Sequence, residues 1–200
     1  KLARIREYMK ECGAAKHILT TLDDICWILN IRGNDVEFFP LVLSYAVITM
    51  DSMELYINEK KLSAEIKEAL AKDGVVLHPY NDIYEDVKKL EDGEVILIDP
   101  GKLNYALYSN IPENVVKVEK RNPEELFKAM KNPVEIENIR KAQIKDRVAH
   151  VRFMKWLKEN IGKQEITEIS ASEKLDEFRC GRACGKSTLF SNTGEQCSAS

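Results

Sequence analysis

The residue types that carry catalytic or metal-binding chemistry are few in this chain and widely spaced. Gly185-Lys186-Ser187-Thr188 matches the end of a phosphate-binding loop, but Cys180 stands where that motif needs its first glycine. Cys180 and Cys184 have the spacing of half a zinc site, yet only Cys197 follows as a third thiol, and a structural site needs four ligands. An irregular tail therefore explains these residues better than a nucleotide or zinc site.

The three histidines stand apart from one another. His17 begins a predicted strand, His78 ends one before a proline, and His150 lies inside a long predicted helix. A lone histidine in such a place is more often packed or hydrogen-bonded than catalytic, so we expect structural roles for all three.

Two groups of aspartates allow both a functional and a structural interpretation. Asp23 and Asp24 could be a carboxylate pair for acid–base chemistry, but their place at the start of a predicted helix favours a capping role. Asp99 follows a buried strand, where open α/β sheets place functional residues. The Pro-Gly pair after Asp99 favours a turn.

A polar loop offers the best candidates for a site. Residues 29–35 combine a single arginine, a glycine and an acid, and the apolar Phe38-Phe39-Pro40 follows. Arg32 could pair with Asp35 to hold the loop, which we prefer, or the two could face a substrate cleft or a neighbouring subunit. From the residues alone we assign no catalytic residue and no metal ligand.

The elements that must position these residues alternate between strand and helix. Short β-rich runs alternate with helical patterns, and a hairpin turn at Asp51-Ser52 makes the sheet mixed rather than purely parallel. The predicted strands are 17–19, 45–50, 54–57, 75–78, 94–98 and 115–118. The predicted helices are 1–11, 63–72, 83–90, 102–109 and 124–130, and a further helix follows Thr21, carries Ile25 to Leu29 and stops before Gly33. The fold class is α/β, a mixed sheet flanked by helices.

The pattern changes at Asn132-Pro133, so we place a domain boundary near residue 131. Apolar residues recur at spacings of three and four from 133 to about 160, which predicts a long helix with a wide apolar face buried against a large surface. Another helix begins at Thr167. Residues 180–200 show neither a helical nor a strand period and indicate a disordered tail.

Composition excludes several classes of protein. The 200 residues carry 30 Lys and Arg against 33 Asp and Glu, a net charge of −3, with the signs mixed along the chain. No run approaches the ~18 apolar residues of a membrane span, and no basic stripe indicates nucleic-acid binding. Five cysteines without a leader sequence favour a reducing, cytoplasmic setting.

Residues 21–35 (TLDDICWILNIRGND) resemble the TALDEIAWLLNLRGSD signature of Xaa-Pro aminopeptidases, also called aminopeptidase P. The continuation NPVFLSYA is matched by Phe39-Pro40-Leu41, with Phe39 in place of the usual asparagine, and by 44–46. Further matches follow in family order, and they are 78–80, 104–106, 129–132, 142–146, 166–171 and 177–179.

The resemblance implies a domain organisation and an activity. Residues 1–130 correspond to a creatinase-type α/β domain, and 131–179 to the first helices of a truncated "pita-bread" metallopeptidase domain. Members of the family remove the N-terminal residue from peptides with proline in second position. They use two divalent metal ions, commonly manganese, which activate a water molecule.

The family's metal ligands are two Asp, one His and two Glu of the pita-bread sheet, beyond the last match at Glu177-Phe178-Arg179. We therefore carry over no ligand and expect the chain to be inactive alone. If the coding frame slips by one nucleotide, the codons for 194–199 can encode the family's GxNAA run. We hypothesise that 180–200 is an out-of-frame translation, which the nucleotide sequence would test.

Two functions follow. The first is a fragment of a cytoplasmic, metal-dependent Xaa-Pro aminopeptidase, whose partners are proline-containing peptides. The second is a stand-alone, non-catalytic α/β interaction domain. In either case the apolar face of the long helix predicts a homo-oligomer or self-association, or mobility of 133–179.

Overall fold

The computed structural model describes residues 1–180, which divide into two compact units. The first spans Lys1–Ala129 and the second begins at Met130. The predictions for the tail, namely the phosphate-binding loop at 185–188, the thiols of Cys184 and Cys197 and the out-of-frame segment, lie outside the described residues. Each unit is described by itself.

The first unit is built on a six-stranded mixed sheet in the order β4-β3-β2-β1-β5-β6. The β1–β2 and β2–β3 pairs are antiparallel, and the other three pairs are parallel. The strands are β1 (Lys16–Leu19), β2 (Ser44–Thr49), β3 (Met53–Ile57), β4 (Val75–His78), β5 (Val95–Ile98) and β6 (Val116–Glu119). The predicted hairpin is the β2–β3 connection, so the mixed sheet is confirmed.

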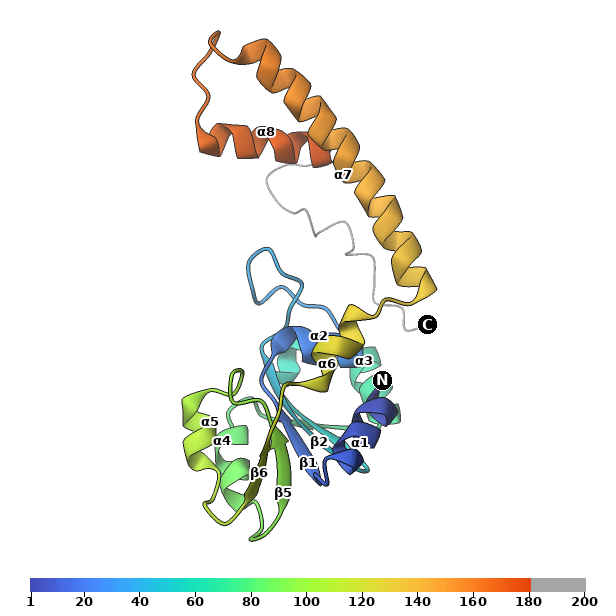
Figure 1. Cartoon of the computed structure of the whole chain (residues 1–200), viewed down its shortest axis with the longest axis vertical. Coiled ribbons are helices and arrows are strands. Elements are labelled where there is room, and N and C mark those ends of the chain that lie inside the picture. The colour runs from blue at the N-terminus through green and yellow to red at the C-terminus, as the bar shows by residue number, and fades with distance from the viewer. Residues whose placement is uncertain (181–200) are drawn as a thin grey trace. The chain divides into compact units, whose positions relative to one another are not determined.

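Helices cover both faces of this sheet (Figure 1). One face packs against α1, α2 and α3, and the other packs against α4 and α5. The helical segments of this unit are α1 (Leu2–Glu11), α2 (Leu22–Leu29), η1 (Glu59–Lys61), α3 (Ala64–Lys72), α4 (Ile83–Asp86), η2 (Val87–Lys89), α5 (Tyr105–Asn110) and α6 (Pro123–Ala129).

Side-chain alternation along the strands produces the two cores. In β2, Ala46 and Ile48 face the α1–α3 side, and Val47 between them faces the α4–α5 side. Leu55 and Tyr56 in β3 divide in the same way. This period of two is the property of a strand that lets one sheet support two helical layers.

The directions of the strands gather many loops at one edge of the sheet. Leu19 at the end of β1 lies opposite Ala46 near the start of β2, and Ile57 at the end of β3 lies opposite Ser44. Because β3–β4, β1–β5 and β5–β6 are parallel, five strands end at this edge and β2 begins there. We call it the carboxyl edge, and it is where open α/β sheets bind ligands.

Between residues 130 and 180 the second unit contains two helices, α7 (Pro133–Asn160) and α8 (Glu168–Cys180). A capping box fixes the start of α7, because the Asn132 side chain accepts from the Glu135 backbone N–H and Glu135 accepts from that of Asn132. The two helices pack together, and the Arg179 Nε donates to Asp146 Oδ1 at 2.8 Å.

The apolar face predicted for the long helix is present, but it is not buried. Ile144 is 64% exposed and Val151 is 70% exposed, whereas Ala149 is the buried residue of α7. Within the described part of the second unit, α8 leaves the Ile144 and Val151 side chains exposed. No helix in residues 1–180 is both long and apolar enough to span a bilayer.

Candidate functional site

The loop predicted to carry the site candidates joins α2 to β2 at the carboxyl edge. We call residues 30–43 the edge loop. Asn30 ends α2 in the left-handed region, with φ of 53°. Gly33 then passes so close to the end of the loop that a Cβ would lie 2.5 Å from Val42 Cγ2, so a side chain there requires Val42 to move. The close approach explains the glycine and indicates a tightly packed base.

Asp35 closes the base of the edge loop. Its Oδ2 accepts from the backbone N–H of Leu43 at 2.8 Å, and its Oδ1 accepts from Lys61 Nζ at 2.6 Å. Burial acts to raise the pKa of Asp35, but the hydrogen bonds from Lys61 and Leu43 outweigh it and hold that pKa below its ordinary value. The carboxylate is therefore a structural clamp between the edge loop and the turn after β3.

Arg32 does not make the ion pair that we preferred from the sequence. Its Nη1 donates to the carbonyl oxygen of the adjacent Ile31 at 2.8 Å, and Asp35 binds Lys61 instead. Within residues 1–180 no ion pair involves the guanidinium of Arg32, which lies in an exposed residue. Sequence reasoning thus missed Lys61, the partner of Asp35.

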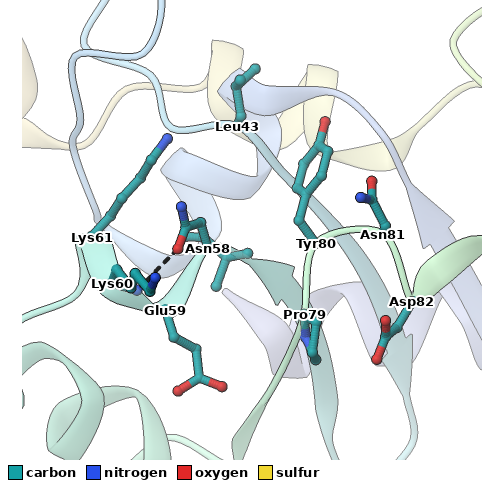
Figure 2. A pocket seen from close by; sticks show the side chains of 10 residues that line it. Leu43, Asn58, Glu59, Lys60, Lys61, Pro79, Tyr80, Asn81 and Asp82 are labelled. Atoms are coloured by element: carbon teal, nitrogen blue, oxygen red, sulfur yellow. Dashed lines mark hydrogen bonds between the residues drawn. The ribbon is translucent and has the colours of Figure 1, made fainter.

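A hollow of about 580 Å³ lies beside this clamp at the carboxyl edge. Figure 2 shows the turn after β3, with Lys60 and Lys61, on one side and the turn after β4, with Pro79 and Tyr80, on the other. Leu43 lies at the mouth between them. The remaining lining residues are Ile57, Asn58, Glu59, Asn81 and Asp82. Sequence reasoning missed the hollow, although the place of each turn directly after a strand was a usable signal.

Tyrosines form a second wall next to the hollow. The Tyr45 and Tyr84 hydroxyl oxygens are 3.0 Å apart, and the Tyr45 and Tyr80 ring centroids are 5.0 Å apart. Burial raises the pKa of Tyr45 above its ordinary value. The Tyr45 hydroxyl therefore stays protonated at physiological pH, and the rings offer aromatic surface with hydrogen-bonding hydroxyls.

The tip of the edge loop presents two aromatic rings to water. Phe38 is 74% exposed and Phe39 is 60% exposed. Phe38 also has a φ of 67°, a conformation that is uncommon for residues other than glycine. Exposed aromatic side chains on a firmly held loop are typical of an interaction surface.

The histidines near the sheet make structural contacts, as predicted. His17 is fully buried, and its Nδ1 lies 3.0 Å from the carbonyl oxygen of Leu97. His78 Nε2 lies 2.6 Å from Glu54 Oε2, and its ring stacks on Tyr56. His150 is exposed on α7.

The aspartates that could have formed acid–base pairs are also held in structural roles. Asp23 and Asp24 lie in the first turn of α2, and both accept from Lys128 Nζ on α6. They therefore join two helices, and their negative charge also interacts favourably with the positive end of the α2 dipole. Asp99 Oδ1 accepts from the Gly101 backbone N–H at 2.9 Å, as expected for a turn, and its Oδ2 accepts from that of Asn122.

Metal coordination is not supported by the described part of the chain. Within residues 1–180, no three His, Cys, Asp or Glu side chains come together to hold an ion. What the carboxyl edge offers is a hollow, an aromatic wall and a protruding tip. This arrangement is suited to binding a ligand in the hollow or a protein surface at the tip.

The comparisons with known proteins agree with the fold. The sequence profile of the Creatinase/Prolidase N-terminal domain matches residues 1–135. The chain belongs to this family. Xaa-Pro aminopeptidase 1 of Dictyostelium discoideum is 38% identical over 184 residues, which cover 90% of this chain and 29% of that protein. The probable Xaa-Pro aminopeptidase P of Neurospora crassa is 32% identical over 194 residues, covering 92% and 28%.

A solved structure supports the same relationship. The X-prolyl aminopeptidase of Caenorhabditis elegans, described as a cytosolic enzyme with a di-nuclear active site, has a TM-score of 0.79 and 29% identity. The match covers 90% of this chain and 30% of that one. The Xaa-Pro dipeptidase of Bacillus anthracis shares the fold, with a TM-score of 0.61 at 18% identity. The creatinase-type fold is therefore confirmed, and the chain spans under a third of the length of these aminopeptidases.

Proposed function

We propose that this chain is a non-catalytic segment of a cytoplasmic, metal-dependent Xaa-Pro aminopeptidase. The whole enzyme removes the N-terminal residue from peptides with proline in second position. The observation that carries the proposal is the 38% identity to Xaa-Pro aminopeptidase 1 over 90% of the chain. The structural match to the cytosolic X-prolyl aminopeptidase supports the same activity and location.

The two units have different roles in this proposal. Residues 1–130 are the creatinase-type domain, and 131–179 are the first helices of the pita-bread peptidase domain. The exposed apolar residues of α7 support this assignment, because such a face is built to cover a sheet. The same face favours self-association when that sheet is not present, and homo-oligomers of the whole enzyme are part of the proposal.

The metal pair belongs to another part of the enzyme in this proposal. Two divalent ions, commonly manganese in the family, would act as Lewis acids and activate water. The described residues do not fit such a site, since no three metal-binding side chains among them converge. No step of the hydrolysis is therefore assigned to residues 1–180.

The edge loop is the part of the domain that meets substrate or a partner subunit. Asp35 fixes its base through Lys61 and Leu43, while Arg32, an exposed residue without an ion pair among residues 1–180, lies earlier in the same loop. An arginine on a fixed loop can bind a carboxylate in bidentate fashion, as a peptide or a neighbouring subunit would provide. Arg32 and Asp35 thus remain the proposed cleft- or subunit-facing residues.

A stand-alone interaction domain is the second candidate function. The exposed Phe38 and Phe39 at the tip of the edge loop favour it, because aromatic anchors dominate protein interfaces. In that case a partner protein would co-purify with the chain, and substitution of both phenylalanines by serine would abolish the association.

A direct assay tests the first proposal. The purified chain is loaded with Mn²⁺, dialysed, analysed for bound metal and incubated with a Xaa-Pro peptide. We expect no stoichiometric metal and no release of the N-terminal residue. Turnover accompanied by two tightly bound ions per chain would contradict the non-catalytic role. A full-length aminopeptidase from Dictyostelium discoideum serves as the positive control for metal loading and peptide quality.

A further inference from the structure

The hollow at the carboxyl edge lies where the chain leaves two adjacent strands toward opposite faces of the sheet. β3 and β4 are parallel neighbours. From β3 the chain passes through η1 into α3 on one face, and from β4 it passes into α4 on the other face. Connections that diverge in this way leave a crevice between them, and open α/β sheets bind their ligands in such a crevice. The hollow occupies it, because its lining comes mainly from residues 57–61 and 79–82.

Both walls of the hollow are closed turns. On the wall after β3, the Asn58 side chain accepts from the Lys60 backbone N–H at 3.2 Å, and the Lys61 N–H donates to the Asn58 carbonyl oxygen at 3.0 Å. On the wall after β4, the Asp82 N–H donates to the Pro79 carbonyl oxygen at 3.0 Å. A site whose walls are fixed before a ligand arrives loses less conformational entropy on binding.

The two walls carry opposite charges that no ion pair neutralises. Lys60 lies on the wall after β3 and Asp82 on the wall after β4 (Figure 2). Within residues 1–180, neither the Lys60 ammonium nor the Asp82 carboxylate makes a hydrogen bond or an ion pair. Other charged side chains around the hollow are in ion pairs of their own, and these pairs are Lys61–Asp35, Glu59–Lys67 and Lys89–Asp86. Lys60 and Asp82 are therefore available to a ligand.

Apolar and aromatic surface completes the lining. Ile57 is completely buried behind the hollow, and Pro79 lies on the wall after β4. Leu43 and the Tyr80 ring lie at the mouth (Figure 2). The Tyr80 ring packs against Tyr45 with 5.0 Å between the ring centroids, so it is a supported surface. Apolar groups that a ligand buries here add to its affinity in proportion to the area removed from water.

We propose that the hollow binds a small zwitterion with an apolar side chain, whose carboxylate pairs with Lys60 and whose α-ammonium pairs with Asp82. A free apolar amino acid and a short apolar peptide share this chemistry. A ligand with a single charge would leave one of the two walls without a partner. The volume of about 580 Å³ lies within the range of about 300–1,000 Å³ of small-molecule sites. The site does not rest on the proposed peptidase function, because binding requires no metal and breaks no bond.

Titration of the isotopically labelled full chain, followed by NMR, tests the site without any substitution. The ligands are leucine, leucyl-leucine, N-acetylleucine, which lacks the ammonium, and leucinamide, which lacks the carboxylate. We expect the zwitterions to shift amide signals of 57–61 and 79–82, and the two analogues to bind about fivefold more weakly than the better zwitterion. That zwitterion identifies the source, amino acid or peptide.

Two results of this titration would overturn the proposal. One is equal affinity for the zwitterions and both analogues, which would mean that the hollow does not read the two charges. The other is the absence of shifts in 57–61 and 79–82 up to millimolar ligand. Leucyl-leucine contains no proline, so the outcome is independent of any Xaa-Pro peptidase activity.

Substitutions assign each end of the ligand to its wall. Lys60→Met should weaken the binding of the zwitterion about fivefold but should not weaken that of leucinamide, which has no carboxylate. Asp82→Asn should weaken the zwitterion to a similar extent but not N-acetylleucine, which has no ammonium. Loss of affinity for both analogues in either variant would contradict the assigned ends.

Matched controls separate contact with the ligand from a change in the charge of the whole chain. Lys88→Met and Asp92→Asn remove the same charges from exposed residues outside the lining of the hollow. Both should keep the wild-type affinity for the zwitterion. Losses in these controls equal to those of Lys60→Met and Asp82→Asn would overturn the site, because they would show that net charge alone governs binding.

Discussion

The sheet and the α7–α8 helices use the same kinds of apolar residue in opposite ways. Ile48 in β2 and Leu55 in β3 are completely buried, whereas Ile144 and Val151 in α7 are 64% and 70% exposed. The first unit supplies its own covering layers on both faces of the sheet. The described part of the second unit, residues 130–180, holds two helices, and α8 does not enclose the wide apolar face that the sequence of α7 creates.

The difference teaches that amphipathic patterning predicts an element more securely than its burial. A helical period depends on the order of residues in one segment, and residues 133–160 contain it. Burial depends on a second surface, which a local pattern does not describe. The same apolar substitution should therefore change the free energy of unfolding by different amounts in the sheet and in α7.

The largest expected effect comes from the same substitution in both regions. Ile48→Ala leaves a cavity in the centre of the sheet and should lower the free energy of unfolding by about 2–5 kcal/mol. Ile144→Ala removes a side chain that is already largely in water and should change it by less than about 0.5 kcal/mol. Urea unfolding followed by circular dichroism measures both.

Equal losses in the two variants would break this comparison. A large loss for Ile144→Ala would show that α7 is covered in solution. Sedimentation of both variants at the same concentration separates covering by self-association from covering within one chain.

A smaller effect tests how much the Asp35–Lys61 ion pair at the base of the edge loop contributes to the stability of the first unit. Lys61→Met removes the partner of Asp35 and should cost under about 1 kcal/mol, because Lys61 is 37% exposed in its side chain. Lys60→Met is the matched control, since the neighbouring Lys60 has no ion pair within residues 1–180 and its loss should change stability little. Chemical unfolding at pH 6 compares the loss of stability in the two variants.

The pH dependence of the Lys61 effect has a defined sign. The pKa of Asp35 is lowered in the folded chain, so its ion pair stabilises above the ordinary aspartate pKa of about 3.9 and is lost as pH falls through the lower folded value. The gap between wild type and Lys61→Met should therefore shrink as the pH is reduced from 5 toward 3. A gap that stays constant would refute the clamp.

Most of the fold could be predicted because its elements are defined locally. Alternating apolar residues marked the strands, and Ser63 and Gly74 marked the ends of α3. The helix expected over 102–109 begins later, at Tyr105, because the Asn104 side chain caps it by accepting from the Leu107 N–H. A cap and a turn residue look alike in sequence, so the boundary was missed by three residues.

The site was harder to predict because its contacts join distant segments. Asp35 is bound by Lys61, 26 residues away, and the sequence indicated only the nearby Arg32 as a partner. The pairing of His17 with Glu124 spans 107 residues. Periodicity contains no information about such pairs, whereas the gathering of strand ends at one edge does indicate the general place of a site.

Hydrogen exchange resolved along the chain tests the central contrast most directly. At a concentration where sedimentation shows a monomer, amides of β1, β2 and β3 should exchange only through global unfolding, and those of α7 should exchange faster by at least about tenfold. This result would show that the sheet unit is self-sufficient and that α7 presents an uncovered face. Protection of α7 equal to that of the strands, in the monomer, would contradict the account.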